Sequence, residues 1–271
     1  TNTAITVDVN VASTNNMTAG GLIGRCDDAL KVSVENVTLN GTDVVTTNKN
    51  ALTSMAGGII GYVNDTNTTL RTEPMTFKNI SLIQSNVSAY DKGSIVGNLK
   101  AQNVVIGTVS VNNQCKIGDT ADGVGGGVVG RVLGKKIEIK DVTIDALQIC
   151  AYVRGGLIGT VDDTSDDSNA VWNSQVRITN ASVSTNFNNG HAGGNSAGGL
   201  VGRAQKGSLV NISGNINVTT TALGSAGNKG YIVGQQMGSL VYFEENTTFS
   251  KAGANGVYDN AGNYGGVIQN I

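Results

Sequence analysis

Clusters of aspartate are the residues in this sequence best suited to carry out chemistry. Paired carboxylates cleave glycosidic bonds when they lie about 5–10 Å apart across a sugar. The candidates are Asp27-Asp28, Asp119 with Asp122, and Asp162-Asp163 with Asp166-Asp167. They fall in loops of different repeats, and aromatic residues, which stack on sugars, are only 4% of the chain. A non-enzymatic protein is therefore favoured over a polysaccharide-cleaving one.

The acidic loop at residues 162–167 also has the ligand chemistry of a calcium site. Carboxylate oxygens suit this hard cation, so Asp162, Asp163, Asp166 and Asp167 are its candidate ligands. The loop lacks the ligand spacing of known calcium loops, and a solvated turn is the favoured interpretation. One histidine and three scattered cysteines do not supply the spacing of a zinc site. We predict no cofactor.

Cys115 and Cys150 form a candidate disulfide. They fall on equivalent segments of adjacent repeats, two residues out of register. That offset separates their Cα atoms by about 8 Å, which is too far for an unstrained bridge. A bulge would close the gap, so a disulfide and a pair of free thiols both stay open.

Several Asn-x-Ser/Thr sequences are candidate glycan acceptors in an exported protein. A chain rich in Asn, Ser and Thr makes some of them by chance. Asn64, Asn67 and Asn246 fall in apparent loops and are the better candidates. The others that we consider are Asn16, Asn40 and Asn86.

A five-residue motif recurs eight times and sets the organisation of the chain. It consists of two small residues, two branched apolar residues and a glycine, and its copies begin about 29–43 residues apart. A repeat of this period indicates a solenoid, a propeller or an array. The copies are Gly20–Gly24, Gly57–Gly61, Gly93–Gly97, Gly126–Gly130, Gly155–Gly159, Gly198–Gly202, Gly230–Gly234 and Gly265–Ile268.

A longer segment that follows the motif alternates apolar and polar residues, as a half-buried strand does. The alternation slips by one residue at Asn36, Asn79, Asp141 and Asn180. Because such a slip would otherwise turn half of the apolar residues toward water, we predict a bend or bulge there. We expect these four residues to stack along one corner, and the Ser or Thr two positions later to stack along an outer face.

These segments predict an all-β fold, a parallel β-helix with about eight coils and three short strands per coil. The crossover rule predicts a right-handed coil. We assign residues 1–271 to a single β-solenoid domain with an incomplete half-coil at each end. The two half-coils complement each other, so we expect a fragment of a longer array or a subunit that polymerises head to tail.

The composition argues against two classes of partner. Charged residues make up only 14% of the chain and its net charge is −2, so neither nucleic acid nor an anionic membrane is a predicted partner. No stretch approaches the roughly 18 consecutive apolar residues of a membrane span.

The repeated Gly-Gly-[Leu/Ile/Val]-[Ile/Val]-Gly motif resembles the short GLUG-type repeat of large bacterial surface proteins. These include adhesins and the non-catalytic regions of IgA-cleaving peptidases. All eight copies match at least loosely, and with their flanks they span nearly the whole chain. The resemblance implies a surface-exposed β-solenoid that serves as a stalk or adhesive region and carries no catalytic residues.

The preferred hypothesis is a non-enzymatic extracellular or cell-surface solenoid, structural or adhesive, that is a candidate filament subunit. Its expected partners are further copies of the chain, end to end, and glycans or host-surface ligands. The alternative is a polysaccharide-binding or polysaccharide-cleaving β-helix that uses the acidic loop near Trp172.

Overall fold

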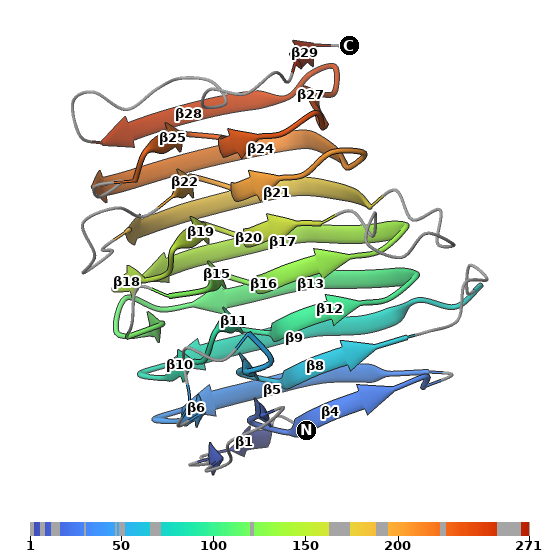
Figure 1. Ribbon diagram of the computed structural model, residues 1–271, viewed down its shortest axis with the longest axis vertical. Helices are drawn as coiled ribbons and strands as arrows, with labels where there is room; N and C mark the ends of the chain where they lie inside the picture. The colour runs from blue at the N-terminus through green and yellow to red at the C-terminus, as the bar shows by residue number, and fades with distance from the viewer. Residues whose placement is uncertain are drawn as a thin grey trace.

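A computed structural model describes residues 3–5, 9–11, 17–29, 31–46, 48, 52–65, 72–119, 122–162, 174–187, 195–222, 226–253 and 267–270. The regular elements in these ranges are all β-strands, and they form four parallel sheets, named A to D below. The chain passes through sheets C, D, A and B in turn, and each turn stacks on the one before (Figure 1). The predicted parallel β-helix is confirmed.

Sheets C and D share the recurring glycine motif and have seven strands each. Sheet C consists of β3 (Thr18–Gly20), β7 (Met55–Gly57), β11 (Asp91–Gly93), β15 (Val124–Gly126), β19 (Val153–Gly155), β22 (Ser196–Gly198) and β25 (Asn228–Gly230). Sheet D consists of β4 (Ile23–Asp27), β8 (Ile60–Asn64), β12 (Val96–Lys100), β16 (Val129–Leu133), β20 (Ile158–Val161), β23 (Val201–Ala204) and β26 (Val233–Gln236).

Sheet A holds the longest strands and lies behind sheet D in Figure 1. Its strands are β1 (Thr3–Ile5), β5 (Ser33–Asn40), β9 (Met75–Ile83), β13 (Asn103–Val111), β17 (Lys136–Ala146), β21 (Gln175–Asn186), β24 (Leu209–Ala222), β27 (Leu240–Phe243), β28 (Thr248–Gly253) and β29 (Val267–Asn270). Both β27 and β28 pair with β24, one after the other along its length.

Sheet B is the smallest and covers only the first part of the stack. Its strands are β2 (Val9–Val11), β6 (Asp43–Thr46), β10 (Asn86–Ser88), β14 (Lys116–Ile117) and β18 (Gln148–Ile149). Beyond β18, the sheet A strands β21 and β24 lengthen to 12 and 14 residues.

The structure corrects the prediction of three strands per coil for the coils up to β18, where each turn uses four sheets; beyond β18 the described turns use sheets C, D and A. The first seven copies of the glycine motif, taken from the sequence as the start of one strand, in fact span two; Val267 and Ile268 of the eighth copy lie in β29 of sheet A. In each of the first seven, the first glycine ends a sheet C strand, the next two residues form a bend, and the sheet D strand begins after it. Backbone hydrogen bonds between coils continue through the bend, as from the Leu22 N–H to the Ile59 carbonyl at 3.1 Å, but the change of direction divides this side into two short sheets.

The glycines of the motif permit adjacent coils to approach closely. A Cβ atom at Gly97 would lie 2.6 Å from the carbonyl oxygens of Ala56 and Gly61 in the preceding coil. Real Cβ atoms do not tolerate such contacts with backbone. The motif is therefore a requirement of coil stacking.

The predicted bend in the sheet A strands is a single residue in the left-handed conformation. Asn36, Asn79, Asp141 and Asn180 have φ between 51° and 59°. On β9 the two sides of this bend bury alternate residues in opposite phase, as the slip in the sequence predicts. Asn tolerates this conformation better than most residues with a side chain. Thr108 occupies the same row with φ 53°.

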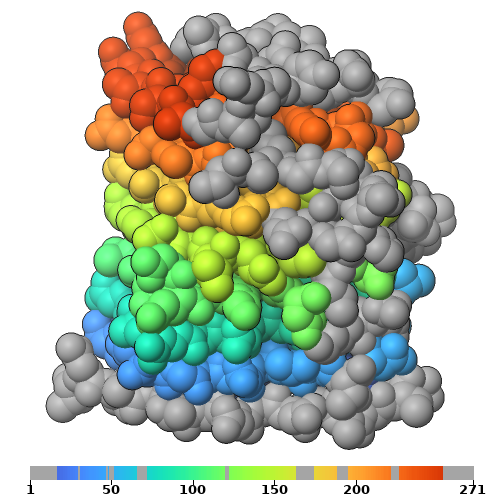
Figure 2. All heavy atoms as spheres, turned by 90° about the vertical axis from the view of Figure 1, so that its left-hand side faces the viewer, coloured from blue at the N-terminus to red at the C-terminus, as the bar shows by residue number. Residues whose placement is uncertain are grey.

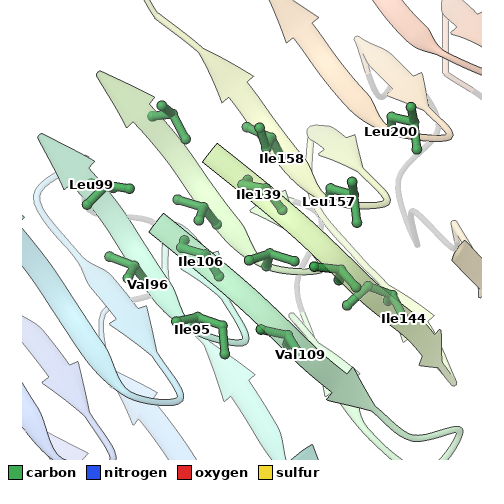
Figure 3. Packing of buried hydrophobic residues seen from close by; sticks show 14 of the residues in the cluster. Ile95, Val96, Leu99, Ile106, Val109, Ile139, Ile144, Leu157, Ile158 and Leu200 are labelled. Carbon is green, nitrogen blue, oxygen red and sulfur yellow. The ribbon is translucent and has the colours of Figure 1, made fainter. Parts of the chain in front are cut away.

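Apolar side chains from sheets A and D fill the axis of the solenoid. Val96 and Leu99 of β12 lie near Ile106 and Val109 of β13, and all four are at most 2% exposed (Figure 3). Figure 2 shows the described residues as bands in chain order, from blue at the bottom to red at the top, as successive coils stack. Burying each such side chain contributes roughly 1.5–3 kcal/mol, so the stack itself stabilises the fold.

Candidate functional site

Asp162, the one described member of the predicted calcium site, belongs to an ionic network on the outer surface. Arg131 donates from its NH1 group to Asp162 and from Nε to Asp91 at 3.0 Å. Gln205 donates to the other oxygen of Asp162 at 2.5 Å, and Asn98 donates to Asp91 at 2.9 Å. These residues come from four successive coils, so the network braces the stack laterally.

The charges of this network compensate one another. Burial alone would lower the pKa of Arg131, but Asp91 and Asp162 outweigh it and raise that pKa well above its ordinary value. The side chain of Asp91 is 2% exposed. Both oxygens of Asp162 already accept hydrogen bonds from side chains, which favours a bracing role over cation binding.

Three of the four predicted calcium ligands, Asp163, Asp166 and Asp167, lie outside the described residues, as does Trp172. Within the described ranges, no group of three or more His, Cys, Asp or Glu side chains is placed to hold a metal ion.

Two further candidate carboxylates, Asp27 and Asp119, also have protein partners. Arg25 pairs with Asp27 at 2.7 Å, and hydrogen bonds from Arg25 and Asn64 lower the pKa of Asp27. Asp119 accepts a hydrogen bond from Ser88 of β10.

Cys115 and Cys150 are both free, so of the two alternatives left open by the sequence the structure has the pair of free thiols. Lys116 and Ile117 pair with Gln148 and Ile149, which places the two cysteines three residues out of register. Three residues span about 10 Å along a strand, beyond the reach of a disulfide. Both cysteines are buried, and burial raises the pKa of each thiol.

The candidate glycan acceptors differ in their surroundings. Asn40, at the end of β5, and Asn246, in the turn before β28, are exposed. Asn64 accepts from the Tyr62 hydroxyl at 3.1 Å, and Asn86 donates to Asp43 at 2.6 Å. Asn40 and Asn246 are therefore the more accessible acceptors. Asn16 and Asn67 lie outside the described residues.

The predicted polar rows are present on sheet A. Asn79 donates to Asn36 at 3.0 Å, and Asn180 donates to Asp141 at 2.9 Å. Two positions later, Thr38, Ser81, Ser110, Thr143 and Ser182 pair in register along the sheet. These rows form a regular outer face of hydroxyl and amide groups.

Two buried cations were not predicted from the sequence. Lys92 of β11 and Arg154 of β19 have 0% exposed surface. Lys92 donates to the backbone carbonyls of Ala89 and Asp122 at 3.0 and 2.7 Å, and Arg154 donates to that of Ala151 at 2.9 Å. Burial lowers the pKa of Lys92 to about 8 and that of Arg154 to about 10.

These cations secure the short corners between sheets B and C. Each lies in the pattern Ala-Tyr-x-[Lys/Arg]-Gly, at residues 89–93 and 151–155, which is a signal that the sequence does contain. Gly125 pairs with both residues from the strand between them, and a Cβ there would lie 3.5 Å from Lys92 Cε. The small residue leaves room for the long side chain.

No family model, curated protein or solved structure matches this chain. No helix in the described ranges is long and apolar enough to cross a membrane.

Proposed function

We propose that the chain is a non-enzymatic structural or adhesive rod at the cell surface or outside the cell. The observation that carries this proposal is the in-register stacking of four parallel sheets, with equivalent residues at equivalent positions in successive coils. Each coil is bonded to its neighbours by ladders on every side where these sheets extend, a construction suited to bearing load and presenting a long surface. The resemblance of its motif to GLUG-type repeats supports the extracellular location.

The rod extends by end-to-end contact. Among the described strands, β3 and β4 are the outermost of sheets C and D at one end, and β25 and β26 at the other. Parallel strands at an edge carry unpaired hydrogen-bonding groups that can accept another strand. Pairing of β29 with β1 of a second copy, the outermost described strands of sheet A, would continue the ladder from one copy to the next.

Sedimentation velocity over a range of concentrations tests this extension. We expect species that grow in length with concentration. Fusing a small globular domain directly to the C-terminus should abolish the growth, because it obstructs one end of every rod.

The matched control carries the same domain on a long Gly/Ser linker, which leaves the end accessible. Growth in this control and its loss in the direct fusion would support end-to-end assembly. A monomer at all concentrations, or equal growth in both fusions, would overturn it.

A further inference from the structure

A surface cavity of about 280 Å³ lies at the N-terminal ends of several sheet A strands. Four strands, β17, β21, β24 and β27, start next to one another there. Its volume is at the lower end of the range of small-molecule sites, which suits a single sugar ring.

Four side chains in strict register form one wall of this cavity. Glu138, Arg177, Asn211 and Tyr242 pair in that order across the four strands. Adjacent strands lie about 4.8 Å apart, so the row presents four different polar groups over about 14 Å. No glycine motif or Asn corner contributes to it.

The cavity favours an anion. Its charged lining residues are Lys135, Lys136, Arg177 and Glu138, and Glu138 is held at 3.2 Å by Lys140. Arg177 donates from NH2 to Glu244 at 2.6 Å, yet its side chain is 53% exposed. The guanidinium has five N–H donors in a planar fork, so donors remain for a carboxylate.

Asn211 positions its neighbours on this wall. Its Nδ2 atom donates to the Tyr242 hydroxyl at 3.0 Å and to Glu244 at 2.7 Å. Its Oδ1 atom is buried and accepts no hydrogen bond from the described residues. Because Oδ1 is closed to solvent, Asn211 acts on this wall by holding Tyr242 and Glu244 in place.

Tyr242 supplies an apolar surface beside these polar groups. The hydrogen bond from Asn211 fixes its hydroxyl, and hence the ring, against β24. A fixed aromatic ring is a suitable platform for the C–H face of a pyranose, because Tyr combines an apolar body with a polar tip.

We propose that this cavity binds one carboxylated sugar unit of an acidic polysaccharide. Arg177, with Lys135 and Lys136, receives the carboxylate, and the sugar ring lies against Tyr242, which Asn211 holds in place. This inference rests on the proposed adhesive function and specifies its ligand class.

Isothermal titration calorimetry with methyl β-D-glucuronoside tests the proposal, with methyl β-D-glucoside as the neutral counterpart. We expect the uronide to bind at least ten-fold more tightly than the glucoside, and less tightly at higher salt. Arg177→Gln should weaken uronide binding at least ten-fold.

Arg25→Gln is the matched control. Arg25 is also a half-exposed arginine paired with a neighbouring carboxylate, Asp27, but it lies on sheet D away from the cavity. This variant should keep the affinity of the wild-type chain. Thermal melting of both variants verifies that each is folded.

Three outcomes would overturn the proposal: no uronide binding at millimolar concentration, equal affinity for the glucoside, or unchanged binding by Arg177→Gln. Tight binding of inorganic sulfate with no binding of the uronide would also overturn it, by showing an anion site without sugar recognition. If assembly by sedimentation persists while uronide binding fails, the rod function stands and only the ligand class falls.

Discussion

The residues with left-handed backbone conformation in sheet A are the positions at which a single side chain most affects the stability of a coil. In this row Asn36, Asn79, Asp141 and Asn180 adopt the left-handed backbone conformation with little strain, and their side chains hydrogen-bond in pairs. Thr108 adopts the same conformation with a β-branched side chain, which costs roughly 1–2 kcal/mol. The row is therefore weakest at Thr108.

Replacing Thr108 with Asn should stabilise the protein by about 1 kcal/mol. Asn accepts the left-handed conformation and can join the polar row between Asn79 and Asp141. Urea unfolding measures the change, and Ser110→Asn, two residues along the same strand at an exposed position, is the control. No gain for Thr108→Asn, or an equal gain for the control, would show that the conformation at residue 108 carries no strain.

Lys92 should make the free energy of unfolding depend on pH in the alkaline range. Burial lowers its pKa in the folded state to about 8 from an unfolded value of 10.5. Between these values the unfolded chain binds more protons, so the free energy of unfolding rises with pH, by about 3 kcal/mol in all. Below pH 8 the lysine is charged in both states and the gain is absent.

Urea unfolding at pH 7.5 and pH 10.5 checks this effect in the wild-type chain and in Lys92→Met. The variant keeps an apolar side chain of similar length but has no titrating group. The rise should be about 3 kcal/mol larger in the wild type. An identical pH dependence in both proteins would contradict it.

Residue features could be predicted from the sequence where they depend on a few neighbouring residues, and could not where they depend on the pairing of distant strands. The Asn corner was predicted because the phase slip occurs within a few residues of one strand. Thr108 was missed because Thr carries no signal for a left-handed conformation. Whether Cys115 and Cys150 can form a disulfide depends on the register of β14 and β18. Alignment of the repeats predicted an offset of two residues, whereas the structure has three.

Glycines of the motif act at the scale of elements, because they set how closely one coil packs on the next. Gly97→Ala should destabilise the fold by roughly 1–3 kcal/mol, since the new methyl group meets backbone atoms of the preceding coil at 2.6 Å. The backbone atoms cannot move away from the new methyl group as a flexible side chain could.

Gly107→Ala provides the comparison for this prediction. A Cβ at Gly107 of β13 would lie 3.4 Å from the Lys140 side chain, which is an ordinary contact with a flexible group. Chemical denaturation should show little change for this variant or a slight gain. Equal losses at the two glycines would mean that coil spacing does not depend on the motif.

The error at this scale was the number of strands per coil up to β18. The glycine pairs were correctly associated with a corner, but the sequence does not show how sharp it is. A gentle bend leaves one sheet, whereas the observed bend divides the side into sheets C and D. Sheet B likewise ends at β18 through a change in strand length that periodicity does not reveal.

For the whole molecule, the repeat predicted a parallel solenoid because the same residue pattern recurs in every copy. The cavity on sheet A could not be predicted in that way. It combines four unlike residues from four coils, and their proximity follows only from the register of β17, β21, β24 and β27. Features that break the repeat are visible only in the folded chain.

End-to-end assembly is the central claim of the proposed function, and cryo-electron microscopy of the concentrated protein tests it most directly. We expect filaments in which the spacing of about 4.8 Å between coils continues across each junction, with β29 of one copy next to β1 of the following one. Isolated rods at every concentration, or filaments joined side to side, would contradict the claim.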